Sequence, residues 1–149
     1  RKIIFSWVQR EFRNLLKARE SNVSVPTPFG FLNNVLVMEF IGTKNITPKL
    51  KDKIPKNPEN FLDKIIDNMI KLNKTGLVHA DLSPFNILNH NERPVFIDFS
   101  QTTTTQHPNF EDYLKRDIKN VSTFFRKHGL KVDEEKILRK ITSSQNKSC

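Results

Sequence analysis

Three oxygen-bearing side chains stand at a spacing that suits phosphoryl transfer. The pattern His-x-Asp-x-x-x-x-Asn contains Asp81 and ends at Asn86, and Asp98 follows directly after the apolar residues 95–97. A hairpin between residues 87–88 and 95–97 would bring Asn86 and Asp98 to neighbouring strand ends. Amide and carboxylate oxygens placed in this way can share a hard cation such as Mg²⁺. Asp81 could then orient or deprotonate an incoming hydroxyl.

Each of these residues taken alone has a plainer interpretation. An aspartate or serine before a turn usually caps or forms that turn, and this applies to Asp81 and to Ser83. We expect His79, which lies in an apolar run, to brace the loop and not to act as a base. The ordered combination is more specific than any member, and it favours phosphotransfer chemistry.

The surrounding sequence supplies elements that could position this loop. Helical periodicity over residues 3–19 includes Glu11 on the apolar stripe, so its carboxylate needs a buried cationic partner or lies at the edge of that stripe. Val35 to Phe40 is predicted to be a buried strand that ends at Gly42. Residues 44–57 are predicted to form a basic loop or a short irregular helix. Further helices are expected after the caps at Asn57, Asn109 and Asp133.

Composition limits the possible partners. The net charge is +9 with a pI near 9.8, which favours nucleotides, RNA or other anions, although a solvated lysine-rich surface explains the charge equally well. One cysteine, Cys149, fits a reducing compartment, and we expect a cytoplasmic protein. No membrane-spanning stretch or signal peptide is visible, so no membrane partner is expected. The four glycines never cluster, so no glycine-rich phosphate loop is present.

Several motifs together resemble the RIO-type atypical serine/threonine protein kinases. Residues 77–88 resemble their catalytic loop, and Ile97 to Gln101 resembles their metal-binding Asp-x-x-Gln segment. Trp7 with residues 11–15 is similar to the regulatory helix, and residues 35–42 resemble the hinge strand. His107-Pro108 followed by residues 113–117 resembles the first RIO kinase subfamily. The likeness extends from about Trp7 to Phe125.

The resemblance implies an α+β, protein-kinase-like fold. Residues 1–42 would form a partial N-terminal lobe with the regulatory helix and hinge strand. Residues 43–142 would form a mostly helical C-terminal lobe that carries the catalytic loop, and residues 143–149 a frayed tail. The implied cofactors are ATP and Mg²⁺ or Mn²⁺, and the implied partners are a protein substrate or a pre-ribosomal particle in small ribosomal subunit maturation, with RNA contacting the basic surface.

The resemblance also implies a role for each site residue. Asp81 would be the catalytic-loop aspartate, and Ser83 fits the same pattern. Asn86 and Asp98 would be metal ligands, and Asp98 could itself accept phosphate. Asp117 would hold the backbone of the catalytic loop. The implied ATP-binding residues are Met38, Glu39, Ile41, Leu88, Ile97 and Glu11.

The sequence departs from the family pattern in two places. Pro84 replaces a usually acidic residue, which is expected to stiffen the loop without removing the chemistry. No glycine-rich loop and no strand lysine precede Glu11, so we expect this chain to be an incomplete kinase that is close to inactive alone.

Two other classes of function stay open at this point. One is a small-molecule phosphotransferase, although the 48 residues after Gln101 are few for the substrate-binding helices of such enzymes. The other is a catalytically impaired module that binds RNA or protein. The substrate, the oligomeric state and the balance of kinase and ATPase activity are not indicated by the sequence.

Overall fold

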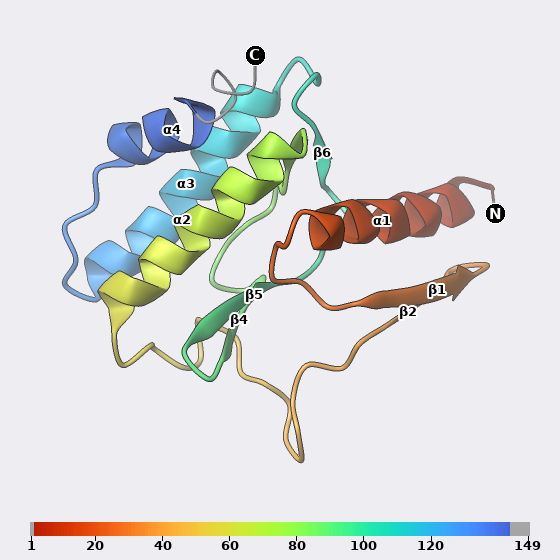
Figure 1. Cartoon of the computed structure of the whole chain (residues 1–149), viewed down its shortest axis with the longest axis horizontal. Coiled ribbons are helices and arrows are strands. Elements are labelled where there is room, and N and C mark those ends of the chain that lie inside the picture. Colours follow the sequence, from red (N-terminus) through yellow and green to blue (C-terminus); the bar gives the residue numbers. More distant parts are fainter. Residues whose placement is uncertain (1, 144–149) are drawn as a thin grey trace.

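The described chain divides into a helical region and a smaller region built around one helix and one hairpin. The computed structural model describes residues 2–143, and the side chains of residues 7–143. Figure 1 shows α2, α3 and α4 packed together on one side, with α1 above the β1–β2 hairpin on the other. The elements are α1 (Lys2–Glu20), β1 (Pro28–Leu32), β2 (Val35–Met38), α2 (Pro58–Lys74), β3 (Leu77–Val78), β4 (Ile87–His90), β5 (Arg93–Phe96), β6 (Thr103–Thr104), α3 (Phe110–Lys127) and α4 (Glu134–Ser143).

The predicted helix starts are confirmed. The side chain of Asn57 accepts a hydrogen bond from the N–H of Asn60 at 3.1 Å, next to a proline at the first helical position of α2. Asp133 accepts from the N–H of Lys136 at 3.2 Å and so caps α4. Asn109 precedes α3 but makes no capping bond with its side chain. Residues 44–57 form no helix, as the irregular-loop prediction allows.

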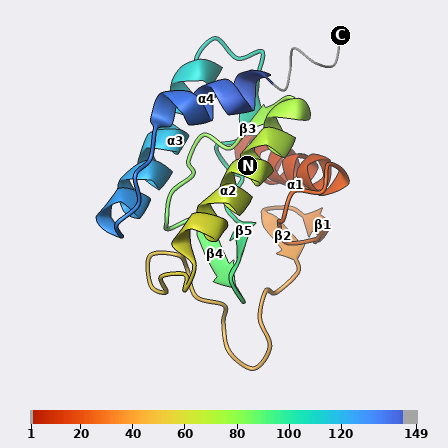
Figure 2. The ribbon, with the colours of Figure 1, turned by 60° about the vertical axis from the view of Figure 1, so that its left-hand side comes forward.

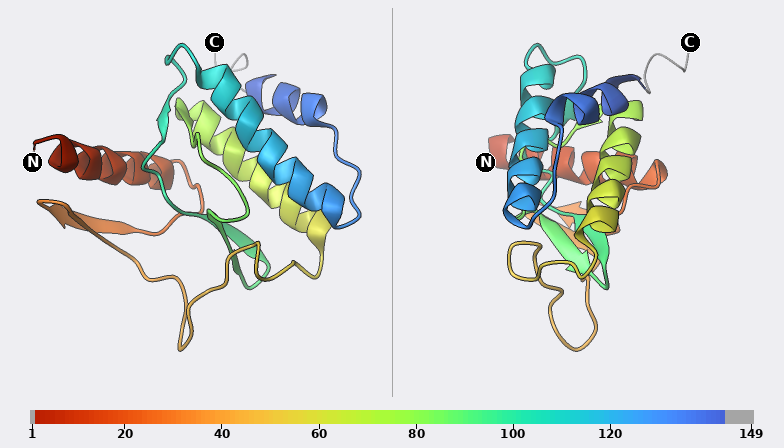
Figure 3. Two further views of the ribbon diagram at one scale, coloured as in Figure 1. Left: turned by 180° about the vertical axis from the view of Figure 1, so that it is seen from behind. Right: turned by 90° about the vertical axis from the view of Figure 1, so that its left-hand side faces the viewer.

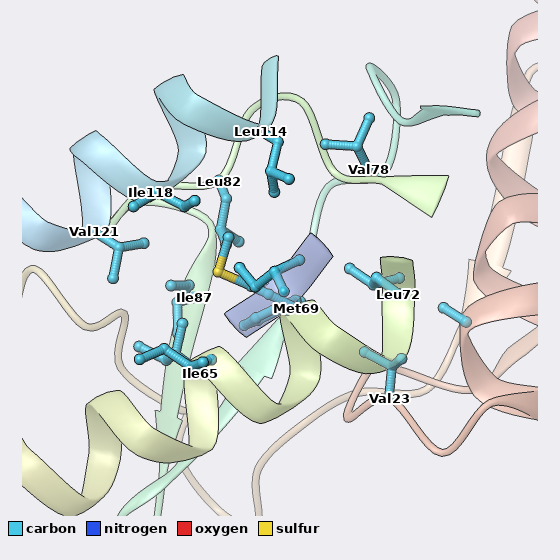
Figure 4. Packing of buried hydrophobic residues seen from close by; sticks show 14 of the residues in the cluster. Val23, Ile65, Met69, Leu72, Val78, Leu82, Ile87, Leu114, Ile118 and Val121 are labelled. Carbon is cyan, nitrogen blue, oxygen red and sulfur yellow. The ribbon is translucent and has the colours of Figure 1, made fainter. Parts of the chain in front are cut away.

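A hydrophobic core holds α2 and α3 against the catalytic-loop segment. Figure 4 shows Met69 of α2 next to Leu82, with Leu114 and Ile118 of α3 close by. These four side chains are at most 5% exposed. Burying a side chain of this size contributes roughly 1.5–3 kcal/mol, so the segment around Leu82 is fixed from both helices. Figure 2 shows α4 crossing the ends of α2 and α3.

The β4–β5 hairpin turns where the sequence predicted. Asn91 and Glu92 have φ values of 50° and 67°, the left-handed pair that a tight two-residue hairpin needs. Ile87 pairs with Phe96, and just beyond that pair the N–H of Ile97 donates to the carbonyl of Asn86 at 3.0 Å. The hairpin therefore sets Asn86 and the residue before Asp98 side by side.

The predicted strand over Val35 to Phe40 is present, but the prediction that it is buried and reaches Phe40 is wrong. The strand ends at Met38, and Val35 and Val37 are 56% and 52% exposed. In the described residues this strand pairs with β1 alone, in a two-stranded sheet whose helical neighbour is α1. One helix covers one face of such a sheet, so alternate side chains stay in solvent. Strand β1 was not predicted, because Gly30 and the neighbouring prolines weaken its pattern.

Two further predictions concern the C-terminal residues and membrane-spanning helices. Ser143 is the last residue of α4 and not the start of a frayed tail, and residues 144–149 lie outside the described part of the chain. Among the described residues, no helix combines the length and the hydrophobicity needed to cross a bilayer.

Candidate active site

Asp117 holds the backbone of the predicted catalytic loop, residues 77–88, as the family resemblance implied. It lies on α3, is 1% exposed, and accepts hydrogen bonds from the N–H groups of Ala80 (2.9 Å) and Leu82 (3.0 Å). Ala80 has a φ of 71°, a region that L residues rarely adopt. Arg116 donates to the carbonyl of Ala80 at 2.7 Å. These bonds from one helix stabilise a strained backbone directly before Asp81.

Burial dominates the electrostatics of Asp117. It raises the pKa of this carboxyl from 3.8 to about 7, against the opposing effect of the Leu82 and Ala80 N–H groups and the Arg116 charge. The nearby charge of Asp81 acts in the same direction as burial. The protonation state of Asp117 therefore changes with pH near neutrality, and the contribution of this residue to the free energy of folding depends on pH.

His79 braces the loop from the other side. Its ring is buried, its Nε2 lies 2.9 Å from the carbonyl of Ile97, and its Nδ1 accepts from the N–H of Asp81 at 3.2 Å. Burial lowers the pKa of His79, which keeps the ring neutral. One neutral tautomer satisfies both bonds, with Nε2 as donor and Nδ1 as acceptor. The expectation of a bracing histidine is confirmed, and this ring links Asp81 to the strand that leads to Asp98.

The side chain of Asn86 is hydrogen-bonded to Asp81. Its Nδ2 donates to the carbonyl of Asp81 at 2.8 Å and to the Asp81 carboxylate at 3.3 Å. This orientation uses the amide nitrogen and leaves Oδ1 for a ligand. Asp98 is exposed, has a φ of 60°, and accepts from the N–H and the hydroxyl of Ser100 through Oδ1. Of the three side chains predicted from their spacing, Asp81 and Asn86 thus lie in one hydrogen-bonded loop, and Asp98 lies just after the end of β5.

One cleft contains all six residues predicted to bind ATP. It has a volume of about 630 Å³ and is also lined by Asp98. Met38 and Glu39 come from the end of β2, Leu88 and Ile97 from the β4–β5 hairpin region, and Glu11 from α1. Asp81, Ser83 and Asn86 are not among its lining residues, but the carbonyl of Asn86 accepts a hydrogen bond from the N–H of Ile97, which lines it.

The segment predicted to be the hinge has two backbone groups without a hydrogen-bond partner among the described residues. The N–H of Glu39 donates to the carbonyl of Thr27, and the carbonyl of Ile41 accepts from Thr47. Within the described residues, the carbonyl of Glu39 and the N–H of Ile41 have no hydrogen bond. An acceptor and a donor two residues apart match the edge of a planar heterocycle that offers one donor and one acceptor.

Glu11 contacts the segment that follows Asp98. Its carboxylate accepts from the N–H of Phe99 at 3.3 Å. Burial raises the pKa of Glu11, and the Asp98 charge raises it further, while the Phe99 N–H lowers it. Glu11 is half-buried with a backbone donor and so lies at the edge of the apolar stripe, one of the two predicted alternatives. A cation bound beside Asp98 would reduce the repulsion between the two acids.

Ser83 has a local role in the structure. Its hydroxyl accepts from the N–H of Phe85 at 3.2 Å, and its carbonyl accepts from the N–H of Asn86. This is the turn function that was the plainer interpretation, and a catalytic role for Ser83 stays a prediction.

Two lysines of the cleft were missed from sequence. Lys49 and Lys51 line it, and the Nζ of Lys51 lies 5.2 Å from the ring centre of Phe85 while pairing with Asp52 at 2.9 Å. The sequence showed them only as part of the basic loop. The N–H of Lys51 donates to the carbonyl of Pro84, a contact between distant segments that has no sequence pattern.

The donor set suits a hard cation. Asn86 and Asp98 supply oxygen atoms, which Mg²⁺ prefers, and nucleotide phosphates and water usually complete its octahedron. Residues 7–143 contain no group of three or more His, Cys, Asp or Glu side chains that could hold a metal. A closed site made only of such side chains is therefore not formed by these residues, and a metal shared with a nucleotide fits the residues present.

The family model for the RIO domain matches residues 1–137 of this chain. The chain belongs to the RIO domain family. It is 43% identical over 136 residues to the RIO-type serine/threonine-protein kinase Rio1 of Thermoplasma acidophilum, covering 91% of this chain and 72% of that protein. It is 39% identical over 145 residues to the serine/threonine-protein kinase RIO1 of Saccharomyces cerevisiae, covering 93% and 30%. This RIO domain spans 50% of the Rio1 kinases of Haloferax volcanii and Methanocaldococcus jannaschii.

Solved structures show that the fold is protein-kinase-like, as predicted. The Rio2 kinase of Chaetomium thermophilum matches with a TM-score of 0.81 and 22% identity, over 95% of this RIO domain and 46% of that chain. The complex of the same kinase described as ADP/Mg²⁺-phosphoaspartate matches with a TM-score of 0.72, over 98% and 56%. The α+β assignment with a partial kinase domain is confirmed.

Proposed function

We propose that this RIO domain binds ATP with Mg²⁺ and transfers the terminal phosphoryl group to a hydroxyl or to water. The observation that carries the proposal is the link from the cleft to Asp81: Ile97 lines the cleft and is bonded to Asn86, whose side chain is bonded to Asp81. The cleft offers an apolar floor at Leu88 and Ile97 and a backbone edge at the hinge. The curated relatives are named serine/threonine protein kinases, which favours a protein hydroxyl over a small-molecule acceptor.

Each of these residues would have a separate role in the proposed reaction. The metal, when bound, neutralises phosphate charge, and Asn86 Oδ1 with the Asp98 carboxylate would hold it. Asp81 would orient the acceptor hydroxyl and take its proton as the new P–O bond forms and the bond to ADP breaks. Asn86 fixes the Asp81 carboxylate, and Asp117 and His79 fix the loop backbone. Most of the rate gain would come from this positioning.

Asp98 is also a candidate phosphate acceptor. A carboxylate can attack the terminal phosphorus, release ADP and form an acyl phosphate that water then hydrolyses. The related Rio2 structure carries a phosphoaspartate with ADP and Mg²⁺. The exposed carboxylate of Asp98, with one oxygen held by Ser100, is compatible with this ATPase route.

Metal-dependent nucleotide binding tests the proposal. Titration of the chain with ADP by calorimetry should show affinity that rises with Mg²⁺, and Asp98→Asn should lose most of that rise. Asp63→Asn is the matched control, because Asp63 is an exposed aspartate of α2 outside the cleft. Magnesium-independent affinity, or an equal loss in both variants, would contradict the assignment.

Turnover in a protein that carries this domain gives the second measure. Removal of one fixed charge-stabilising group commonly costs on the order of a hundredfold in rate, so Asp98→Asn should lose at least that much ATP turnover. Asp81→Asn should slow transfer to protein while leaving Mg-ADP affinity within about twofold, because Asp81 lies outside the nucleotide cleft. Wild-type turnover in Asp98→Asn would refute the role of Asp98.

The proposed partners follow from the surface. Residues 44–56 carry Lys44, Lys53 and Lys56 in exposed positions, and this loop would contact RNA phosphates on a pre-ribosomal particle during small-subunit maturation in the cytoplasm. Affinity for RNA should fall steeply with salt. A flat salt dependence would leave these lysines as ordinary surface.

A further inference from the structure

A second pocket is lined by residues 101–104, directly after the segment proposed to bind the metal. It has a volume of about 570 Å³ and shares no lining residue with the nucleotide cleft. Figure 3 shows the elements that form it, with β6 passing between α1 and the start of α3. Its lining residues are Arg10, Asn14, Ala80, Gln101, Thr102, Thr103, Thr104, His107, Tyr113 and Arg116.

The side chains that line this pocket include basic groups but no acidic group. Two guanidinium groups and one imidazole line the pocket together with amides and hydroxyls, and no carboxylate lines it. The side chain of Arg10, on α1, makes no hydrogen bond or ion pair with residues 7–143. The Arg116 guanidinium lies near the buried Asp117 carboxyl, and two guanidinium groups that line one pocket still favour an anion bound between them.

Arg116 is held in position for such an anion. Its Nη2 donates to the carbonyl of Ala80 at 2.7 Å, and its guanidinium carbon lies 5.3 Å from the ring centre of Tyr113. A guanidinium has five N–H donors, so most remain available after this one bond. A preoriented guanidinium loses little freedom on binding, which favours the forked geometry that phosphate groups accept.

We propose that this pocket binds the phosphate group of a phosphoserine or phosphothreonine in a protein chain, bridging Arg10 of α1 and Arg116 of α3. A phosphate monoester carries up to two charges and three acceptor oxygens, enough for both arginines and a threonine hydroxyl. The volume exceeds that of a phosphate group and has room for the attached residue.

The position next to the catalytic loop favours a protein-borne phosphate. Ala80 lines the pocket and Asp81 is the next residue, one Cα step of about 3.8 Å away. A substrate whose hydroxyl faces Asp81 could therefore place a neighbouring phosphorylated side chain in the pocket; this step rests on the proposed kinase function. The same contact would tie α1, and with it Glu11, to the catalytic lobe.

Fluorescence anisotropy with a labelled phosphoserine peptide tests the site in the 149-residue chain. The peptide should bind at least about tenfold more tightly than its unphosphorylated form, and Arg10→Gln should weaken it by about tenfold, the effect of losing one charge-assisted bond. Arg13→Gln removes the same charge from an exposed position of α1 outside the pocket and should leave affinity within about twofold. Circular dichroism confirms that both variants fold.

Four outcomes would overturn the proposal. They are equal binding of the two peptides, equal weakening by the two variants, displacement by inorganic phosphate at the peptide's own Kd, and an RNA oligonucleotide that binds more tightly with the same Arg10 dependence. The Asp98→Asn variant should still bind the phosphopeptide. Retained binding in that variant separates failure of the nucleotide site from failure of this pocket.

Discussion

The region around α2, α3 and the β4–β5 hairpin differs sharply from the region around α1, β1 and β2. The first buries its apolar side chains and holds the catalytic loop through Asp117 and His79. The second carries most of the exposed apolar surface. Among the described large apolar residues that are exposed, eleven of twelve lie between Trp7 and Ile54, and Phe85 is the exception. The predicted catalytic loop therefore lies in the first region, which we call the well-packed region, while the cleft proposed to bind the nucleotide is lined by residues of both regions.

This difference predicts unequal costs for the same substitution. Phe96→Ala, at a fully buried position of β5, should lower the free energy of unfolding by about 4 kcal/mol, because it leaves a cavity in a packed core. Phe29→Ala, at a 66% exposed position of β1, should change it by less than about 0.5 kcal/mol. Urea unfolding followed by circular dichroism measures both, and similar costs would refute the contrast.

The second expected effect is that the free energy of unfolding depends on pH because of Asp117. Its pKa is 3.8 unfolded and about 7 folded, so the folded state binds the proton more tightly. The stabilisation is complete below pH 4 and is lost as pH rises through 7. Between pH 4.5 and 6.5 the free energy of unfolding should fall by roughly 2 kcal/mol from this group.

The Asp117→Asn variant isolates that contribution. It should remove this fall with pH, while an overall loss of stability is expected because the amide nitrogen faces a backbone N–H donor. The difference between the wild-type and variant curves is the quantity to measure, since Glu39, whose lowered pKa comes mainly from the Thr27 N–H, acts with the opposite sign in both proteins. Parallel curves would show that Asp117 does not titrate in this range.

Removing a helix cap in the well-packed region should have a smaller effect on stability. Asn57→Ala removes the bond to the Asn60 N–H and should cost about 1 kcal/mol. Asn109→Ala is the matched control, since Asn109 precedes α3 without a capping bond from its side chain and should cost clearly less. Thermal unfolding of the two variants under one buffer compares them, and equal costs would refute the role of the Asn57 side chain.

The sequence predicted the structure of the well-packed region better than that of the region around α1, β1 and β2. Local patterns identified the caps, the Asn91–Glu92 turn and the spacing of Asp81 and Asn86, because each depends on neighbours in the chain. It failed at Val35 to Phe40, since an apolar run does not reveal how many strands and helices cover it. Lys51 in the cleft and Arg116 on Ala80 were also missed, because those contacts join segments that are distant in sequence.

The smallest expected effect on stability, but a visible one on association, comes from the exposed strand. Val37 of β2 is 52% exposed in a two-stranded sheet, and exposed apolar strands with unpaired backbone groups favour pairing between molecules. Val37→Lys should shift the chain toward monomer in sedimentation velocity while changing the free energy of unfolding by less than about 0.5 kcal/mol. Thr123→Lys adds the same charge at an exposed site of α3 and should leave association unchanged. An equal shift in both variants would assign the effect to net charge, and association unaffected by Val37→Lys would show that this strand is not the contact.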